Sequence, residues 1–545
     1  MSEIAEENST AGKPSRPTPS LGGRARVLSA LTLGSRLLGV VREQIFARLF
    51  GGGLYADALV VAFRIPNLLR DLFAEGALSA ALVPALGRAR ASGGNEESAR
   101  LASAVLGFLA FVVGALTIVG ILFTPTLVDT LAGGFAEGAD GDLKRDEVIR
   151  LTRILFPFLL LLSCAAVLRG VLNVQQRFAI PAFGPPAANA LAIATGVGLL
   201  LSGASPATAA TGWAIALLGG GLVTLLIQLP AVRASGWRVR PSFNFRHPEL
   251  GNVLRHLSFA AISLAAIQVN IVVGTTLASH LEPGSVAALN YAFRLVYLPI
   301  GVIGVAIATV ATVDLSERVA QGRREEASQG LADGLRLTIF LALPSAVGLW
   351  ILAEPTVRLI YEYNRFTATD TARTAAALRG YGVGLVFYAM TKVQVPACYA
   401  IGSGRLPVWG AVGAMLGFTT FALFTYQDLG VLGLGLGTAL AAALNALILA
   451  VGLQRNLPGG GQVLRGLLVS GLLAAIMGLL CSWLAGVLIE SLGTAGLFPR
   501  LAAVIVPTLV GFALVVGVGK RLRLAEAEEV WRSLRRGDRG PSSIR

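Results

Sequence analysis

The sequence predicts an all-α, polytopic membrane protein with fourteen transmembrane helices, arranged as two six-helix lobes plus two C-terminal helices. Of 545 residues, 54% are hydrophobic and only 14% are charged, which is too apolar for a soluble protein of this length. Runs such as 101–122 and 467–489 carry few or no charges, and ~20 such residues cross a ~30 Å hydrocarbon core as a helix. Sustained series of short, alternating segments are not found, which disfavours a barrel.

Apolar runs bounded by glycine, proline and charge give the position of each helix. The fourteen ranges lie near 28–48, 58–86, 101–125, 150–173, 183–202, 210–232, 253–279, 285–313, 333–353, 374–400, 406–425, 431–453, 463–489 and 499–519. Basic residues gather in alternate connections, for example Arg238 and Arg240 between the sixth and seventh ranges, while the other connections are poorer in base. The positive-inside rule therefore predicts that both termini are cytoplasmic.

The chain also resembles itself at a spacing of about 230 residues. Ala62-Phe63-Arg64 matches Ala292-Phe293-Arg294, and the segment 121–126 matches the segment 351–356. One repeat contains six predicted helices, an even number, so both copies enter the membrane from the same side. We therefore expect two lobes related by an axis along the membrane normal, with a central cavity between them.

These patterns divide the chain into five parts. They are a disordered cytoplasmic tail at 1–24, an N-terminal six-helix lobe at 25–245, a C-terminal six-helix lobe at 246–457, helices 13 and 14 at 458–522, and a basic cytoplasmic tail at 523–545. The first tail lacks the apolar core of a signal peptide, and its polar composition is typical of disorder.

Several charged residues fall inside the predicted spans and are the candidate binding residues. They are Arg36, Arg42, Asp57, Arg64, Arg70 and Arg294. A charge at bilayer depth costs ~2.5 to 3.5 kcal/mol on insertion scales, so it should face protein or water. Asp57 and Arg64 share one helix face, as do Arg36 and Glu43, which allows ion pairing across the first two helices. Guanidinium groups converging on a wet cavity would suit a diphosphate, although arginines can also anchor helix ends or neutralise nearby carboxylates.

Other sequence features restrict the chemistry. The three cysteines, Cys164, Cys398 and Cys481, are widely spaced in apolar surroundings, and the three histidines are scattered, so we expect neither a disulfide framework nor a metal site. The formal net charge is +14, but the basic residues lie in short connections and tails. That placement indicates membrane topology and anionic phospholipids as partners, rather than nucleic acid.

Long motifs in the first two predicted helices resemble those of the MurJ (MviN) lipid II flippase family. They run from Ser35 to Glu43, from Asp57 to Arg70 and from Phe73 to Ser79. Further matches are Asn173 with Arg177-Phe178-Ala179-Ile180-Pro181, then Tyr291 to Pro299, and Arg365-Phe366-Thr367 with Asp370. The resemblance covers roughly residues 25 to 520.

The resemblance implies a transporter, not an enzyme, of the multidrug/oligosaccharidyl-lipid/polysaccharide exporter superfamily in the bacterial inner membrane. It implies that the substrate is lipid II, an undecaprenyl diphosphate bearing a disaccharide pentapeptide. The arginine cluster and the repeat favour its outward movement by alternating access. The cavity arginines of the family fall on Arg36, Arg42, Arg70 and Arg294, with Asp57 and Arg64 beside them. No cofactor is expected, coupling to the membrane potential or a monovalent ion stays open, and cell-wall synthesis proteins are further candidate partners. Tyr297 stands where many members carry Glu or Gln.

Four alternatives have to be weighed. A flippase for another polyprenyl-diphosphate-linked glycan would share the architecture, whereas a cation-exporting antiporter is disfavoured by arginines in the cavity. A membrane-embedded transferase acting on prenyl diphosphate would need paired carboxylates or histidines. The acids between Asp140 and Glu147 look instead like a solvated loop. A scaffold role is the least specific alternative.

Overall fold

The computed structural model describes residues 21–73, 76–137, 140–245, 247–301, 305–458 and 460–536. Within these ranges all regular secondary structure is helical, which confirms the predicted fold class. The predicted tails lie mostly outside the described residues, except that the first helix already begins at Leu21 and a short helix covers 525–536.

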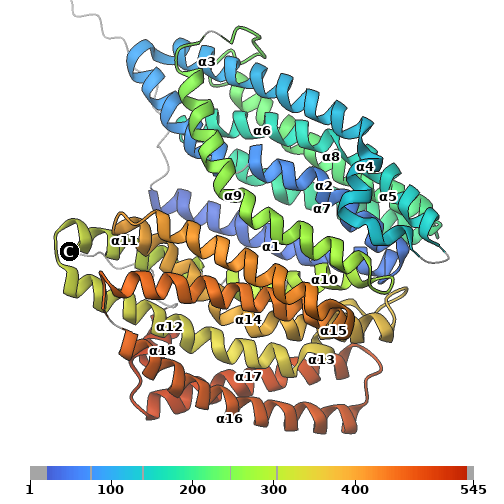
Figure 1. Cartoon of the computed structure of the whole chain (residues 1–545), viewed down its shortest axis with the longest axis vertical. Coiled ribbons are helices and arrows are strands. Elements are labelled where there is room, and N and C mark those ends of the chain that lie inside the picture. Colours follow the sequence, from blue (N-terminus) through green and yellow to red (C-terminus); the bar gives the residue numbers. More distant parts are fainter. Residues whose placement is uncertain are drawn as a thin grey trace, which may run out of the picture.

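The first half of the chain forms one layered group of helices (Figure 1, upper part). Its elements are α1 (Leu21–Phe50), α2 (Leu54–Phe73), α3 (Gly76–Leu122), α4 (Thr124–Ala132), η1 (Gly133–Ala136), α5 (Gly141–Leu155), α6 (Pro157–Val174), α7 (Ala179–Leu201) and α8 (Pro206–Arg233). α3 consists of two helices joined at a kink, where Gly94 adopts a φ of 71° that favours glycine. α7 packs between α1 and α8, and α6 packs on α3 and α8.

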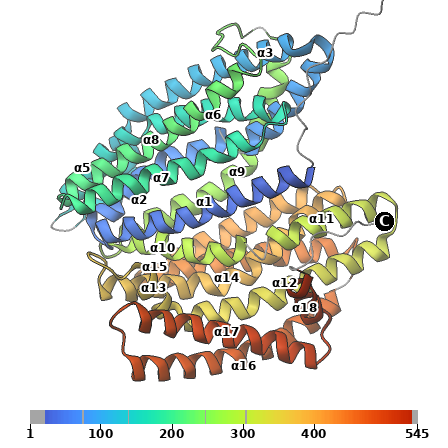
Figure 2. The ribbon, with the colours of Figure 1, turned by 180° about the vertical axis from the view of Figure 1, so that it is seen from behind.

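The second group lies below the first in the same view and continues the chain (Figures 1 and 2). It contains α9 (Leu250–Ser279), α10 (Ser285–Pro299), α11 (Val305–Ala320), α12 (Arg324–Ile351), α13 (Ala353–Tyr361), α14 (Ala368–Ala400) and α15 (Arg405–Gln454). α15 is again two helices joined at a glycine, Gly430, with a φ of 54°. α14 packs against α10, α12 and α15, while α9 contacts both α3 and α15.

Three C-terminal helices complete the chain: α16 (Gly460–Leu492), α17 (Leu497–Arg521) and α18 (Ala525–Arg536). α16 and α17 pack together, and α16 lies against α12 at the outer edge of the molecule (Figure 2). α18 is amphipathic, and its buried Glu526 forms an ion pair with Arg336 of α12 at 2.7 Å. The sequence reasoning missed this helix because it treated the basic residues after 523 as a solvated tail.

Eight described helices or helix pairs are long and apolar enough to cross a membrane. They include the range 81–122 of α3, the kinked α15, and the C-terminal helices α16 and α17. Each of the fourteen predicted ranges is helical over most of its length; residues 123, 156, 202 and 352 are turns, and 74–75 and 302–304 lie outside the described residues. The membrane-embedded character is therefore clear, and the count of fourteen crossings stays a prediction.

The repeat is visible in two short helices that occupy matching places. α4 and α13 each contain nine residues, each follows a long helix after one residue, and each has a proline in its first turn, Pro125 or Pro355. They stand about 230 residues apart in the chain, the spacing of the repeated motifs.

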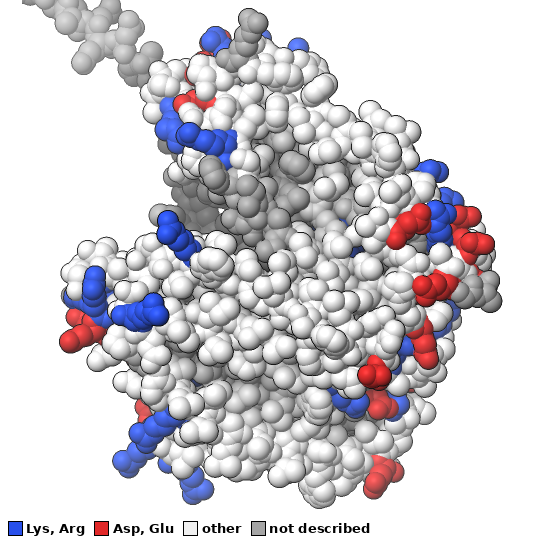
Figure 3. Space-filling model, in the orientation of Figure 1, with Lys and Arg blue, Asp and Glu red and all other residues white. Residues whose placement is uncertain are grey.

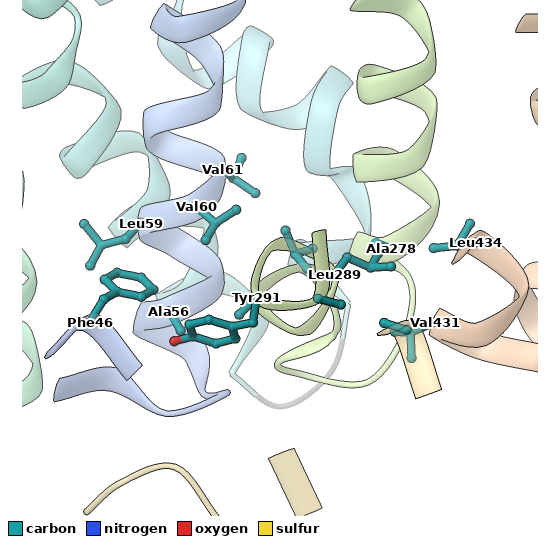
Figure 4. Packing of buried hydrophobic residues seen from close by; sticks show 14 of the residues in the cluster. Phe46, Ala56, Leu59, Val60, Val61, Ala278, Leu289, Tyr291, Val431 and Leu434 are labelled. Atoms are coloured by element: carbon teal, nitrogen blue, oxygen red, sulfur yellow. The ribbon is translucent and has the colours of Figure 1, made fainter. Parts of the chain in front are cut away.

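One buried apolar cluster joins the two lobes at a single end of the bundle. It contains Phe46 and Leu59 of the first lobe together with Leu289, Tyr291 and Val431 of the second (Figure 4). Fully buried Tyr291 packs 5.9 Å from Phe46 by ring centroids, and its hydroxyl donates a hydrogen bond to the carbonyl oxygen of Gly51 at 2.9 Å. We call this the sealed end: the turn 51–53, the start of α10 and the loop 362–367.

Candidate functional site

A cavity of about 830 Å³ lies between the two lobes. Its wall is built by α1, α2, α7 and α8 of the first lobe, and by α9, α10, α14 and α15 of the second. On the side of the molecule where α1 begins, the surface is hollowed between the lobes (Figure 3). We call that side the open end, and exposed Arg36 lines the cavity toward it.

Four of the five predicted arginines line this cavity. Arg36 and Arg42 come from α1, Arg64 comes from α2, and Arg294 faces them from α10. Arg36 and Arg42 both reach the cavity although they are about 120° apart on an ideal helix, because the cavity is wide. The guanidinium of Arg36 crosses to the second lobe, where a Cβ built on Gly301 would lie only 2.7 Å from its Nη1 atom.

A buried carboxylate, Glu43, holds two of these arginines together. Its Oε1 atom lies 2.6 Å from Nη2 of Arg42 and 3.3 Å from Nε of Arg294, so it joins the two lobes. Arg42 also donates to Oδ1 of Asn189 at 2.9 Å, and Nδ2 of Asn189 donates to the carbonyl oxygen of Ser35 at 3.1 Å. These contacts fix the Arg42 fork in the cavity wall.

The charges do not cancel. Among the described lining residues, four arginines face one glutamate, which leaves a surplus of three positive charges. Arg64 donates to the hydroxyl of Thr275 on α9, a neutral acceptor. The remaining wall is largely apolar and aromatic, and includes Phe63, Phe293 and Tyr297. Tyr297, at the position where a polar role was uncertain, stacks beside Phe293 with ring centroids 5.8 Å apart.

Two predicted site residues lie elsewhere. Arg70 is in the last turn of α2 and is not among the described residues that line the cavity. Asp57 is buried at the sealed end, where its carboxylate accepts hydrogen bonds from Lys144 Nζ at 2.7 Å, Gly284 N at 2.7 Å and Ala287 N at 2.8 Å. The expected ion pair between Asp57 and a charge of α1 is absent from these described contacts, because Lys144 of α5 lies beside the carboxylate instead.

Asp57 is instead part of the seal between the lobes. Its carboxylate, on the first lobe, binds the two backbone N–H groups that open α10 on the second, where a negative charge is favoured. The backbones meet here so closely that a Cβ on Gly284, which has a φ of +93°, would lie 1.8 Å from the carbonyl oxygen of Gly52. Lys144 was missed by sequence reasoning, which placed it in a solvated loop.

The seal extends outward to the C-terminal pair of helices. The ring of Tyr363 lies under the guanidinium of Arg48 at 4.7 Å and near that of Arg500 of α17 at 5.2 Å. Arg500 also donates to the carbonyl oxygen of Glu362 at 2.7 Å, and Asn364 Nδ2 donates to the carbonyl oxygen of Arg48 at 3.0 Å. One loop therefore joins the first lobe, the second lobe and α17.

Two helical lobes around a cationic cavity, parted at one end and sealed at the other, define a membrane transporter. The model of the family described as "Lipid II flippase MurJ" matches residues 46–503, most of the chain. The chain therefore belongs to the MurJ family of lipid II flippases.

Individual relatives agree with this assignment. The chain is 35% identical over 434 residues to the "Lipid II flippase MurJ" of Burkholderia cenocepacia, covering 79% of this chain and 83% of the relative. It is 32% identical to the "Probable lipid II flippase MurJ" of Rhizobium meliloti, covering 95% and 97%.

Solved structures show the same fold. A structure described as "Lipid II flippase MurJ, inward closed conformation" matches with a TM-score of 0.75 and 25% identity, covering 91% of this chain and 99% of that one. An inward-facing transporter of the MATE family shares the fold alone, with a TM-score of 0.66 at 16% identity over 81% of this chain and 98% of its own.

Proposed function

We propose that this protein carries lipid II from the cytoplasmic to the periplasmic leaflet of the bacterial inner membrane. The observation that carries the proposal is the cavity in which Arg36, Arg42 and Arg64 of one lobe face Arg294 of the other. A diphosphate presents several oxygens in the geometry that guanidinium forks match, and these groups stay charged at any working pH. Family membership supports lipid II as the lipid that brings this diphosphate.

Binding of the headgroup exchanges partners around Glu43. In this structure the carboxylate accepts from Nη2 of Arg42 and lies against Nε of Arg294. The contact to Arg294 is the longer of the two, at 3.3 Å, and the Arg294 side chain is nearly half exposed. An incoming diphosphate therefore takes Arg294 first, while Arg36 and Arg64 have no carboxylate partner among the described residues and receive the rest of the charge.

Alternating access follows from the two ends. In the orientation that the positive-inside rule favours, the open end is cytoplasmic, both termini lie there, and the sealed end is periplasmic. The headgroup enters between the lobes at the open end while the prenyl chain stays in lipid. Rocking of the lobes then separates Asp57 from the start of α10 and opens the periplasmic side.

No cofactor enters this scheme, and the membrane potential is one source of drive. Moving one elementary charge across the membrane is worth ~2.3 kcal/mol per 100 mV. An inside-negative potential favours outward movement of an anionic headgroup, and it returns the surplus positive charge of the empty cavity toward the cytoplasm. Exchange with a monovalent ion is the alternative drive, and transport at clamped potential with varied ion gradients separates the two.

The test replaces the chain in its host with variants and measures which prenyl-linked precursor accumulates on the inner leaflet. Arg36→Gln and Arg294→Gln should each cause lipid II to accumulate, at normal protein level in the membrane. The matched control is Arg150→Gln, because Arg150 forms its ion pair with Glu147 away from the cavity, and this variant should transport normally. Undiminished transport by both cavity variants sinks the proposal, and accumulation of a different prenyl-linked glycan redirects it to that substrate.

A further inference from the structure

The segment 234–249 connects the two lobes between α8 and α9, and its described residues form no helix of their own. It is nevertheless a built structure. Trp237 is buried in the core of the first lobe. Ser242 N donates to the carbonyl oxygen of Ser103 on α3 at 3.0 Å, and Arg240 N donates to the hydroxyl of Ser103 at 3.2 Å. The segment therefore lies pinned along α3.

A glycine on α3 makes room for this contact. A Cβ added to Gly107 would lie 2.0 Å from the carbonyl oxygen of Ser242, closer than any side chain allows. Further along, His247 Nε2 lies 3.3 Å from Glu97 on α3, and Glu249 forms an ion pair with Arg88 at 3.2 Å. Both ends of the pinned stretch are thus tied to the first lobe.

Between these ties, aromatic side chains point outward from the protein. The ring of Phe245 lies 5.7 Å from Phe108 and 6.1 Å from Phe111 of α3, and 6.4 Å from Phe243, by centroids. Phe243 is 66% exposed, Phe111 59% and Phe245 41%. The cluster is therefore an outer face that lacks a covering layer among the described residues.

The same stretch carries positive charge without a protein partner. Arg238 and Arg240 are exposed and form no ion pair with any residue that the structure describes. The nearby acids Glu97 and Glu249 are already paired with Arg100 and Arg88. These guanidinium groups therefore attract an anion from outside the protein.

The depth along α3 identifies that anion. The apolar run of α3 begins at Leu101, directly after Arg100, so Ser103 marks its first turn. Phe108 and Phe111 lie ~10 to 15 Å beyond Leu101 along the axis, and side chains in a helix lean back toward its N-terminus. The aromatic cluster thus lies just below the membrane surface, and the arginines lie at headgroup level. Aromatic side chains beneath basic ones are typical of an interfacial anchor in an anionic leaflet.

We propose that the segment 237–245, with Phe108 and Phe111, is a binding site for an anionic phospholipid of the leaflet at the open end. Arg238 and Arg240 bind the headgroup phosphate, and the phenylalanine face contacts the upper acyl chains. The site is separate from the transport cavity, so it holds whether or not lipid II is the transported lipid. The bound lipid fixes the connection between the lobes at the membrane surface. The first lobe is thereby held in place while the second lobe moves.

The first test compares full-length protein in nanodiscs of phosphatidylcholine alone with nanodiscs containing phosphatidylglycerol. Phosphatidylglycerol should raise the thermal unfolding temperature and be retained by the protein. The variant Arg238→Gln/Arg240→Gln should bind it roughly 10- to 30-fold more weakly, from two basic contacts at an anionic surface. The matched control, Arg405→Gln/Arg455→Gln, removes two exposed arginines from the same end of the second lobe and should keep the full response. Equal responses of the two variants overturn the proposal.

The second test measures depth and does not depend on lipid affinity. A spin label is placed at Phe243→Cys in a chain whose three cysteines, Cys164, Cys398 and Cys481, are replaced with alanine. The label should be more accessible to oxygen than to a water-soluble nickel chelate, whereas a label at exposed Asn95→Cys should show the reverse. A label at 243 that meets the chelate as freely as the one at 95 also overturns the proposal.

Discussion

Asp57→Asn should weaken the seal between the lobes without touching the cavity. The carboxylate is buried, with 1% of its side chain exposed, and it is the ion-pair partner of Lys144, which is 9% exposed. The hydrogen bonds that the carboxylate accepts from Gly284 N and Ala287 N cross between the lobes, and the loss of one hydrogen bond to a charged group costs ~1.5 to 3 kcal/mol. If the lower value falls on the sealed state only, its population relative to the state opened at that end falls roughly tenfold.

The assay is a distance between spin labels on the two lobes at the sealed end. Exposed positions Ser202 and Asp428 take the labels as cysteines in a chain free of other cysteines. The unaltered seal should give one main distance, and Asp57→Asn should add a longer one. The double variant with Lys144→Met should behave like Asp57→Asn, because Lys144 pairs with Asp57 within the first lobe and not across the seal.

The control is Asp129→Asn, which removes a carboxylate that pairs with Arg145 within the first lobe. It should leave the distance unchanged. If Asp57→Asn keeps the single short distance while protein level and elution are normal, the carboxylate does not hold the lobes together and the reasoning is refuted.

Three further predictions concern neighbouring groups. Glu43→Gln frees the donors of Arg42 and Arg294, so the purified protein should bind a diphosphate lipid roughly tenfold more tightly, a gain that corresponds to one charged hydrogen bond of ~1.5 kcal/mol. Transport by this variant should slow, and unchanged binding would contradict the prediction. Gly284→Ala should lengthen the same spin-label distance, because its Cβ would lie 1.8 Å from the carbonyl oxygen of Gly52, and a normal distance would show that the seal tolerates the methyl group. Hydrogen bonds from Arg145 lower the pKa of Asp129, so the ion pair stabilises the fold above the ordinary pKa of ~3.9, and this stabilisation is lost as pH falls through the lowered pKa. Because the carboxyl is half exposed, the lost stabilisation is under ~1 kcal/mol. The unfolding temperature of the unaltered protein should therefore drop more from pH 6 to pH 3 than that of Asp129→Asn.

The apolar runs and the charges inside them predicted which segments contact lipid and which side chains must face water or protein. A helix that crosses lipid needs ~20 apolar residues, and a guanidinium at that depth must find water or protein. These two requirements placed the long helices and brought Arg36, Arg42, Arg64 and Arg294 to one cavity. Neither requirement depends on knowing which helices are neighbours.

Features that depend on neighbours were not predictable in this way. A helical wheel places Asp57 and Arg64 on one face, but it does not show which residues of other helices lie beside each of them along the axis. In the structure Lys144 of α5 lies beside Asp57. Glu43 shares a helix face with Arg36 and was expected to pair with the second helix, but it joins Arg42 and Arg294 instead. The sequence around Lys144 is typical of a solvated surface, so only the fold could show that this one side chain is buried.

α10 ties these observations together mechanically. The helix has fifteen residues, and Asp57 grips its first turn through the N–H groups of Gly284 and Ala287. Arg294 projects from the same rod ~10 Å beyond Ala287. A rigid helix transmits displacement from one end to the other. An anion that draws Arg294 away from Glu43 therefore also pulls on the contact between Asp57 and the start of α10 at the sealed end. In the proposed mechanism, binding of the substrate at Arg294 and opening of the sealed end are thereby coupled through α10 itself, and no other element is needed to connect them.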